Sequence, residues 1–117
     1  MKLDTKRSAF IAIDLQQAFC TINGSVARQG RDITPCRDAA LRCVELADAS
    51  RANGIPVIWT RIALRPDYAD GGLMINEIRP GLKEVGGIKA GTDDAALIDE
   101  AVVAPEDFVI EKPRHSA

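Results

Sequence analysis

Three short apolar runs of the sequence end in polar side chains that could take part in chemistry. Asp14 closes the first run and Lys112 closes the third, and the second ends in Thr60 and Arg61. If the runs are strands of one parallel sheet, their carboxyl ends lie along a single edge, where open α/β folds bind ligands. We therefore expect Asp14 and Lys112 to lie close together, as a carboxylate and an ammonium available for acid–base work. A salt bridge with no catalytic role is the alternative that this pattern leaves open.

The runs themselves are expected to be strands that are buried on both faces, because each is continuously apolar. They cover residues 8–14, 56–60 and 108–112. Residues 34–53 are typical of a helix, because Thr34 can cap its start, Pro35 suits the first position and Gly54 suits the end. Five residues at helical spacing form its expected buried face: Cys36, Ala40, Cys43, Val44 and Ala47. A strand, a helix and a strand with short joints indicate a right-handed βαβ unit.

The remaining segment connects the second and third runs. Residues 61–91 contain three glycine- or proline-rich points and are expected to form a long loop, with one helical turn near residues 80–84. Residues 93–102 are expected to be a second helix that begins at Thr92 or Asp93. Its inward side chains would be Leu97, Ile98 and Ala101. A sheet that stops after three strands would leave apolar strand faces without helices to cover them.

Two motifs resemble the isochorismatase-like superfamily of cysteine hydrolases. The run FIAIDLQQAF, with Asp14, Gln16 and Phe19, resembles the first strand and turn of that family, and VIEKPRHSA resembles its third strand and catalytic-lysine turn at Lys112. GIPVIWTR resembles the second strand. The resemblance implies an α/β fold, a three-layer Rossmann-like parallel sheet whose C-terminal strands are absent from this chain. Residues 1–117 would then be the N-terminal portion of a single domain.

In amidase members of this family a cysteine thiolate attacks a carbonyl, with an aspartate and a lysine beside it. By resemblance, Asp14 would carry protons and Lys112 would stabilise the charged groups. The family's nucleophilic cysteine lies beyond the lysine motif. None of Cys20, Cys36 and Cys43 matches it, so the triad's cysteine is expected outside this chain.

The resemblance implies a hydrolase of a small amide or carbamoyl compound, because the loop RIALRPDYADGG is most similar to members that act on ureido and carbamoyl substrates. Phe19 would line the substrate pocket, and Arg61 and Tyr68 could bind polar parts of the substrate. His115 is interpreted as a wall or turn residue. Two alternatives stay open: an isochorismatase-type vinyl ether hydrolase, and a non-catalytic binding or interaction module.

Composition and charge exclude several other classes. Hydrophobic residues make up 46% and charged residues 27% of the chain, and the net charge is −2 without any basic block, so neither nucleic acid nor a membrane is an expected partner. No export signal or membrane-spanning run is found, which predicts a cytoplasmic protein with reduced thiols. No metal-ligand spacing or cofactor motif is present, so no metal and no cofactor are expected. The expected partners are a small substrate, the remaining half of the domain or a second chain, and further copies in a homo-oligomer.

Overall fold

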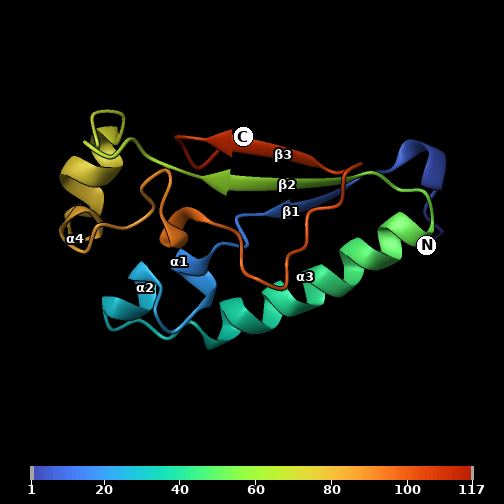
Figure 1. Ribbon diagram of the computed structural model, residues 1–117, viewed down its shortest axis with the longest axis horizontal. Helices are drawn as coiled ribbons and strands as arrows, with labels where there is room; N and C mark the ends of the chain where they lie inside the picture. The colour runs from blue at the N-terminus through green and yellow to red at the C-terminus, as the bar shows by residue number, and fades with distance from the viewer. Residues whose placement is uncertain (1, 117) are drawn as a thin grey trace.

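The computed structural model describes residues 2–116, and within them three parallel strands form one sheet. The strands are β1 (Phe10–Ile13), β2 (Val57–Ile62) and β3 (Phe108–Lys112), in the order β1-β2-β3 with β2 in the centre (Figure 1). In the register of the sheet, Ile13 pairs with Thr60 and Ile62 pairs with Lys112. The three predicted strands and the α/β class are therefore confirmed.

One long helix, α3 (Thr34–Ala52), connects β1 to β2 and packs against them, as the sequence predicted (Figure 1). Thr34 is the first residue of α3 and not its cap, because Ile33 holds the cap position. The Thr34 N–H donates to the carboxylate of Asp32 at 2.9 Å. Gly54 follows the helix end with φ of 70°, a conformation that costs little only without a Cβ. Among the buried side chains between α3 and the sheet are Ala12, Ala40, Ala47, Val57 and Trp59.

Cys36 departs from the predicted helix face, because it is exposed, whereas Cys43 is half-buried. The first helical residue to enter the core is Ala40, one turn further on. The first turn of α3 precedes the part that packs on the sheet, so helical spacing alone placed Cys36 in the core wrongly.

Short helical segments gather near the carboxyl ends of the strands. They are α1 (Gln17–Cys20), α2 (Ser25–Arg28), a π-helical turn (Met74–Ile78) and α4 (Pro80–Glu84). The helical turn predicted near residues 80–84 is thus present. A second apolar cluster lies among these segments and the end of β2, and it includes Ala18, Ile62, Leu64, Ile75, Leu82 and Ile88.

The helix predicted over residues 93–102 is absent, and only a 3-10 turn at Asp93–Ala95 forms there. The reason is that this segment exchanges backbone hydrogen bonds with residues 15–17 instead of with itself. Gln17 N–H donates to the Ala96 carbonyl at 2.9 Å, and Ile98 N–H donates to the Leu15 carbonyl at 2.9 Å. The expected inward side chains still enter the core, with Ile98 and Ala101 buried and Leu97 partly buried.

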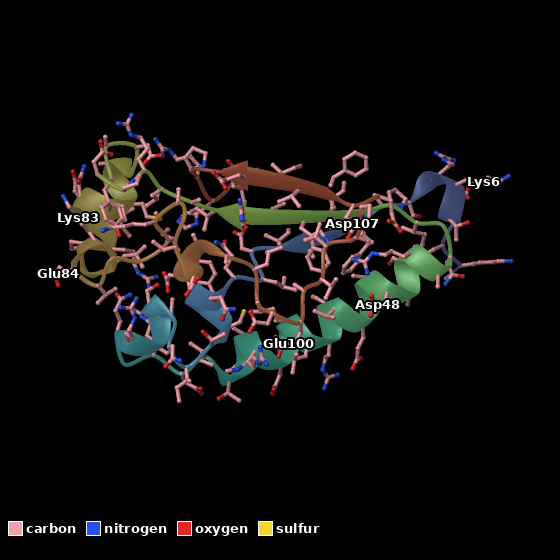
Figure 2. All side chains as sticks on the ribbon, viewed as in Figure 1. Lys6, Asp48, Lys83, Glu84, Glu100 and Asp107 are labelled. Carbon is pink, nitrogen blue, oxygen red and sulfur yellow. The ribbon has the colours of Figure 1, made fainter. Side chains whose placement is uncertain are left out.

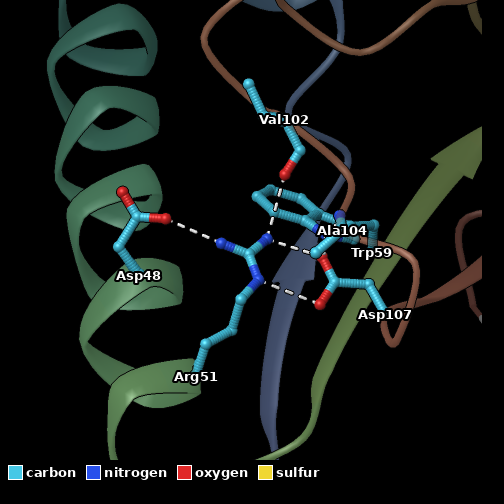
Figure 3. Close-up of polar contacts among 6 residues, drawn as sticks. All are labelled: Asp48, Arg51, Trp59, Val102, Ala104 and Asp107. Atoms are coloured by element: carbon cyan, nitrogen blue, oxygen red, sulfur yellow. Dashed lines mark hydrogen bonds and ion pairs between the residues drawn. The ribbon is translucent and has the colours of Figure 1, made fainter.

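A polar network fixes the chain just before β3 (Figure 3). Arg51, near the end of α3, donates from Nε and Nη2 to the carboxylate of Asp107 at 3.0 and 2.5 Å. Trp59 Nε1 and the Ala104 N–H donate to the same carboxylate at 2.8 and 3.0 Å. Arg51 also lies over the Trp59 ring, 5.9 Å from its centroid. These contacts join α3, β2 and the connection to β3 at the amino ends of the strands.

The face of the sheet opposite α3 is largely uncovered. Because side chains alternate along a strand, the neighbours of Ala12 and Trp59 point away from α3. Four large apolar side chains on that outer face are exposed: Ile11 (51%), Ile13 (64%), Phe108 (60%) and Ile110 (43%). The charged side chains labelled in Figure 2 lie elsewhere, at the ends of the molecule or on the α3 side. The outer face of the sheet is therefore an apolar surface.

Candidate active site

The structure brings Asp14 and Lys112 together at the carboxyl edge of the sheet. Lys112 Nζ lies 2.7 Å from Asp14 Oδ2, and Thr60 Oγ1 donates to Asp14 Oδ1 at 2.8 Å. Each of the three strands contributes one of these residues at or near its carboxyl end: Asp14 follows β1, Lys112 ends β3, and Thr60 lies two residues before the end of β2. The carboxylate is thus held from both sides, by a neutral donor and by an ammonium, with its side chain 20% exposed.

The backbone of Asp14 adopts an uncommon conformation. Its φ is 58°, in the left-handed region that costs a non-glycine residue on the order of 1 kcal/mol. The Asp14 N–H donates to the Thr60 carbonyl at 3.0 Å, which extends the β1–β2 pairing to this residue while the chain turns. Such local strain is found most often where a side chain must be aimed at a functional position.

Lys112 is buried and its ammonium is fully paired. Only 5% of its side chain is exposed, and Nζ donates to Asp14 and to the carbonyls of Arg114 and His115 at 3.2 and 3.1 Å. Three acceptors match the three N–H donors of an ammonium. In a site shielded from water the attraction between this ammonium and the carboxylate is stronger than at the surface. Lys112 is therefore fixed in place and can act on charge near Asp14 without moving.

An apolar cavity of about 360 Å³ lies beside this pair. Two of its lining residues are neighbours of Lys112: Ile62, which pairs with Lys112 in the sheet, and His115, whose carbonyl accepts from Lys112. Asp14 and Lys112 do not themselves line the cavity. The lining residues are Phe19, Val26, Arg31, Ile62, Met74, Ile78, Arg79, Leu82, Ile88 and His115. The structure thus places Phe19 on the wall of this cavity, and His115 is a wall residue as well.

Two other sequence-predicted residues lie away from the cavity. Arg61 points to the other side of the sheet from Thr60 and pairs with Glu111, with 2.8 Å between Nη2 and Oε2. Tyr68 is buried, and its hydroxyl donates to the Gly87 carbonyl at 2.8 Å. Neither side chain lines the cavity, so their roles in substrate binding stay predictions that no contact supports.

None of the three cysteines lies at the Asp14–Lys112 pair. Cys20 lines a separate cavity with Gln17 and Arg37, and burial raises the pKa of its thiol to about 11. Cys36 and Cys43 lie on α3, on the opposite side of the sheet from the outer face. With a pKa of about 11, the Cys20 thiol is almost wholly protonated near neutral pH and is a poor nucleophile.

Gln16 holds the turn after β1 in place through buried hydrogen bonds. The sequence motif included this residue, but its role was not predicted. Its side chain is fully buried, and Nε2 donates to the carbonyls of Ile62 and Ala95 at 2.7 and 2.8 Å. Its Oε1 accepts from the Ile62 N–H at 2.8 Å. This amide ties the turn after β1 to the end of β2 and to the connection that leads to β3. The signal available in the sequence was its place in the motif, two positions after Asp14.

Two further properties concern only the part of the chain that the structure describes. Among residues 2–116, His, Cys, Asp and Glu side chains form no cluster of three or more that could hold a metal ion. No helix in the same range is long and apolar enough to cross a membrane.

Comparison with known proteins gives one family and a consistent fold. A family model described as the isochorismatase domain matches residues 8–117. The ureidoacrylate amidohydrolase RutB of Methylorubrum extorquens (strain AM1) is 30% identical over 125 residues, covering 97% of this chain and 50% of RutB. The chain thus spans about half the length of the curated relatives it matches.

Solved structures agree on the fold. A cysteine hydrolase from Pseudomonas syringae pv. phaseolicola superposes with a TM-score of 0.73 at 24% identity, over 96% of this chain and 49% of that one. N-carbamoylsarcosine amidase from Thermoplasma acidophilum superposes with a TM-score of 0.52 at 20% identity, over 90% and 51% of the two chains. At these identities the likeness describes the fold, a Rossmann-like parallel sheet of which this chain holds the N-terminal portion.

Proposed function

The chain belongs to the isochorismatase family, and on that premise we propose that the full-length protein hydrolyses a C–N bond in a small amide or carbamoyl compound. The observation that carries the proposal is the buried Lys112 ammonium on the Asp14 carboxylate, at 2.7 Å, beside a cavity of small-molecule size. The names of two relatives, a ureidoacrylate amidohydrolase and an N-carbamoylsarcosine amidase, favour this chemistry over the cleavage of a vinyl ether.

In the proposed mechanism Asp14 carries the protons. A cysteine thiol from outside residues 1–117 gives its proton to Asp14, and its sulfur bonds to the substrate carbonyl carbon. When the C–N bond breaks, Asp14 returns that proton to the leaving nitrogen, and a thioester remains. Water then adds to the thioester carbon, the C–S bond breaks, and the thiol is restored. With a carbamoyl substrate the product is carbamate, which decomposes to carbon dioxide and ammonia.

Lys112 and Thr60 hold Asp14 in position for this cycle. The ammonium stabilises negative charge that develops beside it during the reaction, since opposite charges attract strongly in a site shielded from water. Thr60 Oγ1 donates a hydrogen bond to Asp14 Oδ1 at 2.8 Å, and this contact fixes the plane of the carboxylate. The chain's own residues thus supply proton transfer and charge stabilisation.

The proposal is tested by ammonia release from a panel of ureido and carbamoyl compounds with the full-length protein. Asp14→Asn and Lys112→Met are each expected to lower kcat at least ~100-fold, the range attributed to general acid–base groups, without loss of the folded state in circular dichroism. Arg42→Gln, on the exposed side of α3, serves as the control and should keep full activity.

Three outcomes would decide against the proposal. Turnover of isochorismate without ammonia release from any amide would favour the vinyl ether reaction. Wild-type turnover of an amide by the Asp14→Asn variant would remove the carboxylate from the mechanism. No turnover of any compound, together with unchanged assembly of the Asp14→Asn, Lys112→Met double variant, would favour the non-catalytic module.

A further inference from the structure

We propose that Ile88 limits the size of the compound that the cavity admits, and that Asp94 is the positioning residue that holds Ile88 in place. The inference rests on the proposed function and concerns how the same site discriminates between substrates of different size. Ile88 is buried and lies on the wall of the cavity. Asp94 does not line the cavity, so it acts there only through the residues that its carboxylate binds.

The first observation is the strained backbone of Ile88. Its φ is 47°, in the left-handed region that a β-branched residue seldom adopts. Glycine adopts this conformation readily, yet an isoleucine stands at this position, directly after Gly86 and Gly87. Such strain persists only where the surrounding structure fixes it, and it is found most often at functional sites. A bulky side chain at a strained position on a cavity wall indicates that the side chain itself is needed there.

The second observation is that the backbone around Ile88 is held by three hydrogen bonds. The Ile88 N–H donates to Asp94 Oδ2 at 2.7 Å. The Ile88 carbonyl accepts from the Leu64 N–H at 2.8 Å. The carbonyl of the preceding Gly87 accepts from the Tyr68 hydroxyl, also at 2.8 Å. Because Leu64 lies two residues after β2, these contacts fix the strained residue relative to the end of the central strand.

The third observation is that the same carboxylate holds a second part of the cavity wall. Asp94 Oδ1 accepts from the N–H of Ser25, the first residue of α2, at 2.7 Å. The next residue, Val26, lines the cavity together with Ile88. The side chain of Asp94 is only 9% exposed, and hydrogen bonds to an ionised acceptor are stronger than those between neutral groups. One carboxylate thus fixes two wall residues that lie far apart in the sequence.

The experiment measures size selectivity in the full-length protein with N-methylurea, N-ethylurea and N-propylurea, each one methylene longer than the last. One methylene in an apolar pocket changes discrimination about 10-fold or more. Ile88→Val removes one methyl group from the wall and is expected to raise the ratio of kcat/KM for propylurea to that for methylurea about 10-fold. Ile75→Val is the matched control, because Ile75 is equally buried in the same apolar cluster but does not line the cavity. It should leave the ratio unchanged.

Asp94→Asn tests the positioning role. The amide nitrogen that replaces one oxygen cannot accept a hydrogen bond, so either Ile88 or Ser25 loses its partner. We expect the same selectivity ratio to rise and the Ile88 N–H to exchange faster with solvent in NMR. The Ile88→Val, Asp94→Asn double variant should raise the ratio by less than the product of the two single effects, because Asp94 acts partly through Ile88. Asp93→Asn, at the exposed neighbouring position, should change neither the ratio nor the exchange rate.

The inference fails if Ile88→Val and Ile75→Val shift the ratio equally, because any loss of core packing would then have the same effect. It also fails if Asp94→Asn lowers activity on all three ureas alike, or leaves the exchange of the Ile88 N–H unchanged. If the wild type turns over none of the ureas, the proposed function fails separately, and calorimetric binding of the same ureas decides the size limit. Tighter binding of propylurea by Ile88→Val, and not by Ile75→Val, would support the limit. Equal affinities in all three proteins, or no binding, would overturn it.

Discussion

Asp14 is held by more contacts than a surface carboxylate needs. Its two oxygens accept from Thr60 and from Lys112, its N–H extends the sheet pairing, and its φ of 58° turns the chain at this residue. A simple salt bridge at a sheet edge would require only the two charges. Under the proposed mechanism, the added strain and the neutral donor would fix the direction of the carboxylate toward the substrate.

Gln16 gives the sharpest prediction at the scale of single residues. Gln16→Leu removes three buried hydrogen bonds and leaves the N–H and C=O of Ile62 and the Ala95 carbonyl without this partner. Buried groups left unpaired cost about 1–3 kcal/mol each, so we expect the free energy of unfolding to fall by about 3 kcal/mol or more. Urea unfolding of the variant and the wild type measures this difference.

The adjacent Gln17 provides the control for Gln16. Its side chain is partly exposed and donates to Asp99 at 3.0 Å, where water can replace it. Gln17→Leu is expected to cost less than about 1 kcal/mol. Equal losses in the two variants would show that the amide of Gln16 has no special role in holding the turn.

The sequence predicted that Asp14 and Lys112 would lie close together, because both come at strand ends and in family motifs, and the structure places them 2.7 Å apart. The pocket position predicted for Phe19 from the family motif matches its place on the cavity wall. It did not identify the rest of the cavity wall, since residues such as Met74 and Leu82 lie in segments whose positions depend on tertiary packing. Arg61 was predicted at the site because it ends a strand. Alternation along β2 instead directs it to the face opposite Thr60.

At the scale of elements, the continuous apolar runs predicted where the strands lie. The predicted burial on both faces is not present in the structure, because apolar side chains such as Ile13 and Phe108 on the outer face are exposed. The segment 93–102 misled the prediction because its apolar spacing fits a helix equally well. Its burial comes from pairing with residues 15–17, a contact that local sequence cannot reveal. A short 3-10 turn and an extended strip of chain therefore replace the expected helix in the connection to β3.

The network around Asp107 anchors this helix-poor connection (Figure 3). The hydrogen bonds from Arg51, together with those from Trp59 and the Ala104 N–H, lower the pKa of the Asp107 carboxyl to about 2. Its side chain is completely buried, so water cannot replace these contacts. The network therefore ties the start of β3 to α3 in place of the missing helix.

A pH prediction follows for this element. The folded pKa of Asp107 lies below its ordinary value near ~3.9, so ionised Asp107 adds stability that is present above about pH 4 and is lost as the pH falls toward 2. The difference in unfolding free energy between the wild type and Asp107→Asn should be largest near pH 6 and should shrink by on the order of 2 kcal/mol by pH 2. Urea unfolding across this pH range measures that difference.

Asp48→Asn is the matched control for Asp107, because it also removes a partner of Arg51. Asp48 lies 2.7 Å from Arg51 Nη1, but its side chain is 72% exposed. A surface pair of this kind contributes roughly 0–1 kcal/mol. If the wild type and Asp107→Asn differed by the same amount at every pH, the ionisation of Asp107 would not be the source of the stability.

At the scale of the whole molecule, the uncovered face of the sheet is expected to make residues 1–117 associate with other protein surface. Ile11, Ile13, Phe108 and Ile110 present an apolar surface on the side of the sheet away from α3. The relatives of this chain are about twice its length. They share the fold of this N-terminal portion and contain further structure beyond the part that this chain matches. Contiguous apolar surfaces of this kind mark sites where other protein surface binds.

Residues 1–117 produced alone are therefore expected to bind a dye such as anilinonaphthalene sulfonate and to self-associate in sedimentation. Ile13→Thr together with Phe108→Thr should lower both the dye fluorescence and the associated fraction, because the two side chains are 64% and 60% exposed and lose apolar area without disturbing the core. Ile22→Thr removes an even more exposed side chain, at 82%, outside the sheet and should change neither. A monomer that binds no dye would contradict an exposed apolar face on the sheet. Loss of dye binding in the double variant alone would show that the dye binds to these strands.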